Sequence, residues 1–214
     1  MPWPDKPERN ARLLESVEII RALLAGETVT HRGRVSVVEA KLYTRPLSPL
    51  PVYGAAVSSE TARWVGRWAD GLLTVAGDDF DAVRKVVDAF REGGGDGKPV
   101  ILQAALSWAA TEEAAMSMAL EQWRHAAIGG EVAWDLRRPA DFDQASKSVG
   151  EDEIRQSLAV SADWRRHLDW IAALFDLEPA EIHLHQIGRN QRDFIETFGA
   201  HVLPELRRLN SGPR

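Results

Sequence analysis

Residues 51–77 read PVYGAAVSSETARWVGRWADGLLTVAG, and this stretch decides the fold. An apolar run over 52–57 ends in small residues, helix-forming residues follow over 58–69, and a second apolar run fills 71–76. Short, near-continuous apolar runs are typical of strands that are buried on both faces. Because strands that alternate with helices pair in parallel, the stretch predicts a strand–helix–strand unit whose two strands end on small side chains.

The remainder of the chain repeats this order. It predicts strands over 98–109 and 181–188, helices over 78–95, 111–128 and 190–209, and a helical segment, in one or two parts, over 151–177. Ahead of the first strand, the apolar spacing predicts a helix over 8–27, and Arg32-Gly33 indicates a hairpin within 28–43. Residues 129–150 have no clear period, so they are interpreted as a long insertion or lid.

This order defines the expected fold class. We expect one α/β domain over 1–214, with about four β/α units, which is half of a TIM-type (β/α)8 barrel, behind an N-terminal helix and β-hairpin. A small open sheet is the alternative that the same order allows.

Composition narrows the function classes. A net charge of −6 lacks the basic character of proteins that bind nucleic acid or anionic membranes, so neither partner is expected. No apolar run approaches the roughly 18–20 residues of a membrane-spanning helix, and residues 1–10 lack the apolar core of a secretory signal. The absence of cysteine rules out disulfides and thiolate chemistry. We expect a cytoplasmic protein.

The ends of the first two predicted strands are the candidate ligand site, because ligands of parallel α/β folds bind at the carboxyl ends of strands. Small residues at the first end leave room for a planar ligand, and hydroxyls at the following helix start favour an anion. The second strand end also consists of small residues. The alternative for both strand ends is that the small residues serve tight packing and the hydroxyls or carboxylates only cap the helices. At the second turn, that cap would be Asp78 or Asp79. The candidates are Gly54, Ala55, Ala56, Ser58, Ser59 and Thr61 at the first end, and Thr74, Val75, Ala76 and Gly77 at the second.

Weaker candidates lie near the later strand ends and in the insertion. Their side chains suit a substrate pocket, and they are Trp108, Trp134, His185 and Asn190. His183 and His185 point to one face of a strand, but no third ligand is spaced to complete a metal site, so no metal is expected. Arg137 and Arg138 belong either to a lid or to ion pairs on a solvated loop.

Three stretches carry a resemblance to a known family. ERNARLLESVEIIRALLAGETVTHRGR, PVYGAAVSSETARWVGRWADGLLTVAG and NQRDFIETFGAHVLPELRRL resemble the luciferase-like monooxygenase superfamily, the flavin- and deazaflavin-dependent oxidoreductases of bacteria and archaea. GLLTVAG, ALSWA and GGEVAWDLRRPADFDQAS are similar to its probable non-deazaflavin branch. The resemblance implies a (β/α)8 barrel of which this chain corresponds to the later part, and it leaves the catalytic residues unknown.

The resemblance also implies a cofactor and partners. It assigns Ser58 and Thr61 to the phosphate of FMN, with a deazaflavin coenzyme as the alternative. It assigns the first strand end to the ring, and residues 74–77 at the second strand end to a further contact with the cofactor. It implies a small-molecule substrate, with hydride transfer or oxygen activation by the reduced cofactor. A half barrel leaves sheet edges and an apolar interior uncovered, so we expect a homo-oligomer or a complementing N-terminal half. The alternative function is a non-catalytic remnant or subunit that acts as a binding or oligomerisation module.

Overall fold

A computed structural model describes residues 4–77 and 79–210, apart from the side chains of Glu131 and Trp134. The chain divides into two compact units, Met1–Val52 and Tyr53–Arg214. Whether they form the single domain expected from the sequence stays a prediction, and each unit is described by itself. None of the described helices is both long and apolar enough to cross a lipid bilayer.

The first unit is a helix followed by a hairpin, as predicted. Asp5 caps helix α1 (Lys6–Ala25) by accepting a 2.9 Å hydrogen bond from the Glu8 N–H, and Gly26 ends it with a φ of 94°. Strands β1 (Val29–Arg32) and β2 (Ser36–Ala40) pair antiparallel. Glu15 joins the helix to the hairpin, because its carboxylate accepts hydrogen bonds from the Val35 N–H at 3.0 Å and from Arg34 at 3.2 Å.

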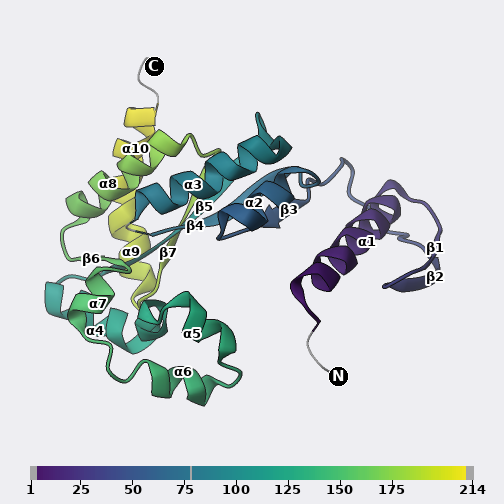
Figure 1. The fold of residues 1–214 in the computed structure, drawn as a ribbon. Coiled ribbons are helices and arrows are strands. Elements are labelled where there is room, and N and C mark those ends of the chain that lie inside the picture. The colour runs from purple at the N-terminus through teal and green to yellow at the C-terminus, as the bar shows by residue number, and fades with distance from the viewer. Residues whose placement is uncertain (1–3, 78, 211–214) are drawn as a thin grey trace. The chain divides into compact units, whose positions relative to one another are not determined.

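The second unit is built on a five-stranded parallel sheet (Figure 1). Its strands are β3 (Tyr53–Ala55), β4 (Gly71–Ala76), β5 (Val100–Trp108), β6 (Ala159–Ser161) and β7 (Glu181–Gln186). Strands β3, β4 and β5 lie side by side in chain order, and β5 then pairs with both β6 and β7. The parallel sheet and its alternation with helices confirm the predicted fold class.

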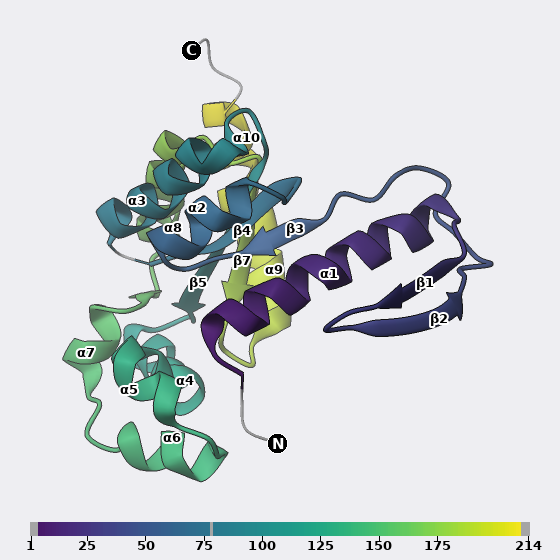
Figure 2. The ribbon, with the colours of Figure 1, turned by 45° about the vertical axis from the view of Figure 1, so that its right-hand side comes forward.

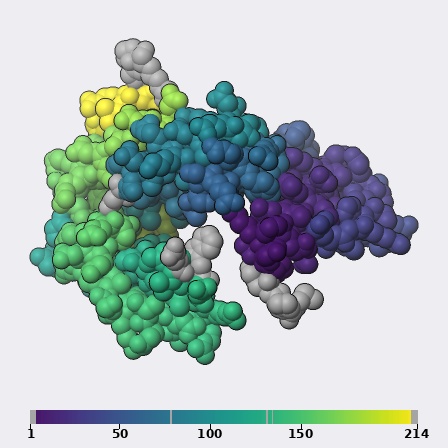
Figure 3. Space-filling model, viewed as in Figure 1, coloured from purple at the N-terminus to yellow at the C-terminus, as the bar shows by residue number. Residues whose placement is uncertain are grey.

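Helices connect the strands. The longer ones are α2 (Ser59–Gly66), α3 (Phe80–Phe90), α4 (Glu112–Trp123), α8 (Trp164–Ala173), α9 (Gln191–Thr197) and α10 (Leu203–Asn210). The stretch predicted as an insertion contains α5 (Gly130–Asp135) and α6 (Pro139–Ala145), and α7 (Glu151–Arg155) follows it. In the space-filling view, the segment of α4 to α7 forms a lobe of the second unit apart from α2 and α3 (Figure 3).

Strand β6 corrects one prediction. Residues 151–177 were expected to be helical, but α7 and α8 are separated by β6, which pairs with the last three residues of β5 from Leu106 to Trp108. A strand of three residues is too short to produce a period in the sequence. Its pairing with β5 is a tertiary effect that overrides the local helical pattern.

The two faces of the sheet differ. Helices α2 and α3 lie over one face of the sheet (Figure 2). On this helix-covered face, Leu72, Leu102 and Ala104 are fully buried in a core that includes apolar side chains of α2 and α3. The residues between them point the other way and are half-buried or exposed. We call this side the open face, and the strand registers place on it Ala55, Leu73, Val75, Ile101, Gln103, Ala105, Glu181, His183 and His185.

Candidate functional site

The turn after β3 presents two hydroxyls at the start of α2. Ser58 is the N-cap, and its Oγ accepts from the Thr61 N–H at 3.4 Å and donates to the Thr61 Oγ1 at 3.0 Å. Ser59 is committed elsewhere, because its Oγ donates to the carbonyl of Lys85 in α3 at 3.2 Å. The Ser58 and Thr61 pair therefore lies where the N-terminal end of a helix favours an anion.

The small residues of β3 divide between two roles. A Cβ on Gly54 would collide with Val65 of α2 and lie 3.3 Å from the Cβ of Ala69, so this glycine lets the helix approach the strand. Ala56 is buried in the same core. Only Ala55 is exposed, on the open face. The room for a ligand that the sequence suggested at Gly54 is thus filled by Val65 of α2, and Ala56 lies inside the core.

The turn after β4 follows the same division. Thr74 and Ala76 are buried on the helix-covered face, whereas Val75 on the open face keeps 49% of its surface exposed. A Cβ on Gly77 would meet nothing within 4 Å, so space is open beside this residue. Asp79 caps α3, because its carboxylate accepts a hydrogen bond from the Ala82 N–H at 2.9 Å. This is the helix cap that the sequence offered as the alternative to a ligand site. Asp78 lies outside the described residues.

The end of β5 is part of the core. The Trp108 indole is 7% exposed, packs edge-on against Phe198 with centroids 6.1 Å apart, and donates from Nε1 to the Ala162 carbonyl at 2.9 Å. The Trp108 side chain therefore packs in the core. The role predicted from the sequence was different, namely to line a substrate pocket.

The backbone of Trp108 is held by two amide side chains, from Gln186 at the end of β7 and from Asn190 at the N-cap of α9. Gln186 accepts from the Trp108 N–H at 3.0 Å and donates to its carbonyl at 2.7 Å. Asn190 donates to the same carbonyl at 3.0 Å and accepts from Gln186 at 2.7 Å. Gln191 in turn donates to the carbonyls of Gln186 and Gly188. Asn190 thus has a structural role here, and its predicted contact with substrate stays a prediction.

The two histidines of β7 lie on the open face, as their spacing predicted. His185 Nδ1 lies 3.3 Å from the Gln103 amide nitrogen, and its ring packs edge-on to Trp123 with centroids 5.0 Å apart. His183 is exposed and pairs with Glu181 at 2.8 Å. In the described part of the chain, no three histidine or carboxylate side chains gather as a metal site.

The remaining candidates lie in the insertion. Trp134 belongs to α5, and its side chain lies outside the described residues. Arg138 pairs with Asp141 at 2.8 Å, and this guanidinium is the main cause that lowers the pKa of Asp141. The solvated ion pair is therefore the better interpretation for Arg138.

Two residues of the site were not singled out from the sequence. Gln103 is the single polar side chain before Ser107 in the run VILQAALSW, which is a signal that sequence reasoning could have used. Trp123 ends α4 without any local sign that it reaches His185 of β7. Together with Ala55 and Val75, these side chains give the open face small, polar and aromatic surfaces near the carboxyl ends of its strands.

Known proteins resemble this chain over nearly its whole length. The F420-dependent glucose-6-phosphate dehydrogenase of Microbacterium testaceum is 28% identical over 214 residues, covering 96% of this chain and 63% of the relative. A solved F420-dependent secondary alcohol dehydrogenase, in complex with an F420–acetone adduct, superimposes with a TM-score of 0.80 at 21% identity, covering 96% of this chain and 64% of that one. A riboflavin lyase with modified FMN has a TM-score of 0.67 at 14% identity, covering 100% and 60%.

These comparisons settle the fold and the family. The chain spans about 63% of the length of the curated relative, and its sheet and helices are a partial version of the barrel of the solved structures. The family model described as luciferase-like monooxygenase matches residues 3–180, which is most of the chain. The chain therefore belongs to the luciferase-like monooxygenase family.

Proposed function

We propose that this chain provides part of the cofactor site of an oxidoreductase that uses a flavin-class coenzyme and a small-molecule substrate. One observation carries the proposal. The turns after two adjacent parallel strands, β3 and β4, lie at the same edge of the sheet and expose hydroxyls, a small side chain and open space beside the open face.

The residues present fit such a group. Ser58 and Thr61 would hold a phosphate at the start of α2, with Ala55, Val75 and Gly77 beside the ring. When bound, the coenzyme supplies hydride transfer, or oxygen activation in its reduced form, and the protein supplies binding and orientation. Ala55 and Val75 would exclude water from one side of the ring, since both are apolar.

Two coenzymes are candidates, the deazaflavin F420 and FMN. The curated relatives are named as F420-dependent, which favours a deazaflavin over the FMN expected from Ser58 and Thr61. The lyase solved with a modified FMN has the same fold, which supports the FMN alternative. We propose F420 as the first candidate and FMN as the second. Oxygen use, the substrate and a cytoplasmic location stay predictions.

Titration of the chain with F420 and with FMN, followed by fluorescence, tests the proposal. Ser58→Ala with Thr61→Ala removes the hydroxyl pair and should weaken binding by about 1–3 kcal/mol, because charge-assisted hydrogen bonds are lost. Ser117→Ala, an exposed serine of α4, is the matched control and should leave affinity unchanged. Equal affinity of the double variant and the parent would remove the hydroxyl pair from the site, and no binding of either coenzyme would reject the proposal for the isolated chain.

The alternative function is a binding or oligomerisation module without chemistry, and the open face favours it. Within the second unit, this face carries Val75 with 49% of its surface exposed beside the half-buried Leu73 and Ile101. Apolar surface of this kind is typically covered by another chain or segment. We propose a complementing set of β/α units, or a second copy of the chain, as the partner. A measurement of coenzyme binding separates the two functions. A module without chemistry would associate with its partner but would bind neither F420 nor FMN.

A further inference from the structure

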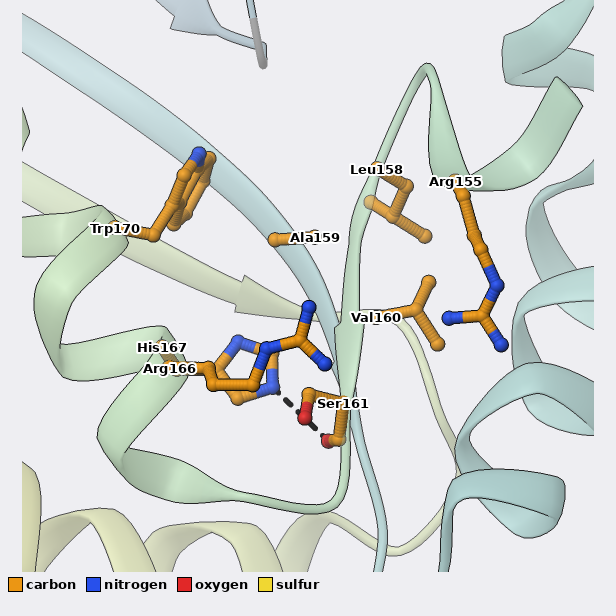
Figure 4. A pocket seen from close by; sticks show the side chains of 8 residues that line it. All are labelled: Arg155, Leu158, Ala159, Val160, Ser161, Arg166, His167 and Trp170. Atoms are coloured by element: carbon orange, nitrogen blue, oxygen red, sulfur yellow. Dashed lines mark hydrogen bonds between the residues drawn. The ribbon is translucent and has the colours of Figure 1, made fainter. Parts of the chain in front are cut away.

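A pocket lies on the second unit beside β6, at the junction of α7 and α8 (Figure 4). Its volume is about 220 Å³, far more than the few tens of Å³ that one water occupies. It is lined by two arginines, by apolar side chains around β6, and by Ser161, His167 and Trp170. None of these residues belongs to the β3 and β4 turns of the proposed coenzyme site.

The two arginines approach the same strand from different helices. Arg155 is the last residue of α7, and Arg166 lies in the first turn of α8. Figure 4 shows their guanidinium groups on opposite sides of β6, both near Val160. Arg155 makes only a loose ion pair, 3.9 Å from Glu151, and Arg166 makes no ion pair within 4 Å of any residue that the structure describes. Most of their N–H donors therefore remain available to a ligand.

His167 adds a buried acceptor. The residue is 1% exposed, and its Nε2 lies 3.0 Å from the Ser161 carbonyl, which only accepts, so Nε2 carries the proton. Burial is the main cause that lowers the pKa of His167, and the neutral ring then leaves Nδ1 as a hydrogen-bond acceptor. Among the described residues, Nδ1 has no partner.

Trp170 contributes a second unsatisfied atom. Its Nε1–H is buried and also lacks a partner within the described part of the chain. Buried polar atoms are nearly always hydrogen-bonded, so a pocket lined by two residues with unsatisfied atoms calls for an occupant. We expect that occupant to accept hydrogen bonds from the arginines and to donate one to His167 Nδ1.

One carboxylate lies close by. Glu112 Oε1 accepts from the Ser161 Oγ at 2.8 Å and from the Ala162 N–H at 3.0 Å, so it is committed to the turn before α8. Burial alone would raise the pKa of Glu112, but these hydrogen bonds and the charges of Arg166 and Arg155 lower it on balance. Glu112 therefore stays ionised, and together with Glu151 beside Arg155 it offsets the charge of the two arginines. Recognition of a ligand would rest on the free guanidinium N–H donors and not on net charge.

We propose that this pocket binds the phosphate group of a small metabolite, or free phosphate, outside the coenzyme site. Guanidinium groups on two sides match the several oxygens of a tetrahedral oxyanion. A phosphate with a second pKa near 6 also keeps a proton in part of its population at neutral pH, and that hydroxyl is the donor that His167 Nδ1 lacks. The volume beyond a bare phosphate ion leaves space for a small organic group.

Calorimetric titration of the full chain with inorganic phosphate, and separately with glycerol 1-phosphate, tests the proposal. We expect binding of at least one, and the tighter ligand tells a free ion from a metabolite headgroup. Arg155→Gln and Arg166→Gln should each weaken it about tenfold or more. Arg165→Gln is the matched control, because Arg165 is exposed and packs over the Trp164 ring, 4.4 Å from its centroid. No binding of either ligand, or equal loss in all three variants, would overturn the proposal.

The histidine gives a readout that net charge alone does not move. Phosphate should shift the ¹⁵N resonance of His167 Nδ1 in the parent chain, and Arg166→Gln should abolish that shift at the same phosphate concentration. A resonance that stays in place while phosphate binds would place the anion elsewhere. Both measurements are made without coenzyme, so the phosphate site stands or fails independently of the proposed function.

Discussion

The side-chain amide of Gln186 pairs with both backbone groups of Trp108, accepting from its N–H at 3.0 Å and donating to its carbonyl at 2.7 Å. The two residues are 78 positions apart, and they are the last residues of β7 and β5 respectively. The amide thus continues the ladder between the strands after their regular pairing ends, and it fixes the edge of the sheet at which ligands of such folds bind.

Replacing Gln186 should destabilise this edge. In Gln186→Ala the buried N–H of Trp108 loses its partner, whereas the Trp108 carbonyl keeps its hydrogen bond from Asn190. We therefore expect the free energy of unfolding to fall by about 1–3 kcal/mol, the cost of one unsatisfied buried group. Urea denaturation measures the change. Gln144→Ala, which removes an exposed amide of α6, should alter stability by less than about 0.5 kcal/mol. Similar losses in both variants would show that the amide pairing is unimportant.

Gly54→Ala should also destabilise the chain, because the added methyl meets Val65 of α2. Overpacking of this kind costs about 1–3 kcal/mol. Val65→Ala would remove the obstacle, so the double variant should be more stable than the sum of the single changes predicts. Thermal unfolding of the four proteins completes this cycle. Strict additivity would mean that Gly54 is required for another reason.

The carboxylate of Glu15 predicts a pH dependence in the first unit. The Val35 N–H is the largest cause that lowers the pKa of Glu15 to about 2. A carboxyl group whose pKa is lowered on folding stabilises the fold above its unfolded pKa, and this contribution is lost as the pH falls toward the folded pKa. Stability should therefore decline between about pH 5 and pH 2, as NMR signals of the hairpin would report. In Glu15→Gln the decline should be smaller, and an unchanged pH profile would assign it to other carboxylates.

Val75 tests whether the open face is covered by a partner. Val75→Lys introduces a charge at a position that is 49% exposed, so the fold should tolerate it with a change of roughly 0.5 kcal/mol or less. If a second chain or a complementing segment covers this face, the same change should abolish the association in analytical ultracentrifugation. Lys98→Ala, on the amino-terminal side of β5, serves as the control. Association that survives Val75→Lys would place the interface away from Val75.

The sequence predicted the order of elements better than the roles of single residues. The unit expected over 51–77 is confirmed as β3, α2 and β4, because apolar runs and an N-cap at Ser58 are local signals. Gly54 could not be interpreted locally, since a glycine that admits a ligand and one that admits a helix look the same until Val65 is placed beside it.

Contacts between distant positions account for the rest. The hydrogen bonds of Gln186 to Trp108 and the packing of Trp123 against His185 join residues that no pattern links. The pocket of Arg155 and Arg166 depends on β6, which the sequence did not indicate. These features arise from the register of the sheet, and register over such separations is specified by the whole core.

The packing of α7 against α4 has a consequence for how this chain could diversify. Ile154 of α7 is fully buried with Met116 and Ala119 of α4, so the excursion over 124–150 leaves and rejoins the body of the second unit at neighbouring helices. Lengthening a loop whose ends are already fixed costs little, because the closure entropy grows only with the logarithm of its length. We therefore expect changes in the length of the segment with α5 and α6 to cost little stability and to leave the edge of the sheet unchanged.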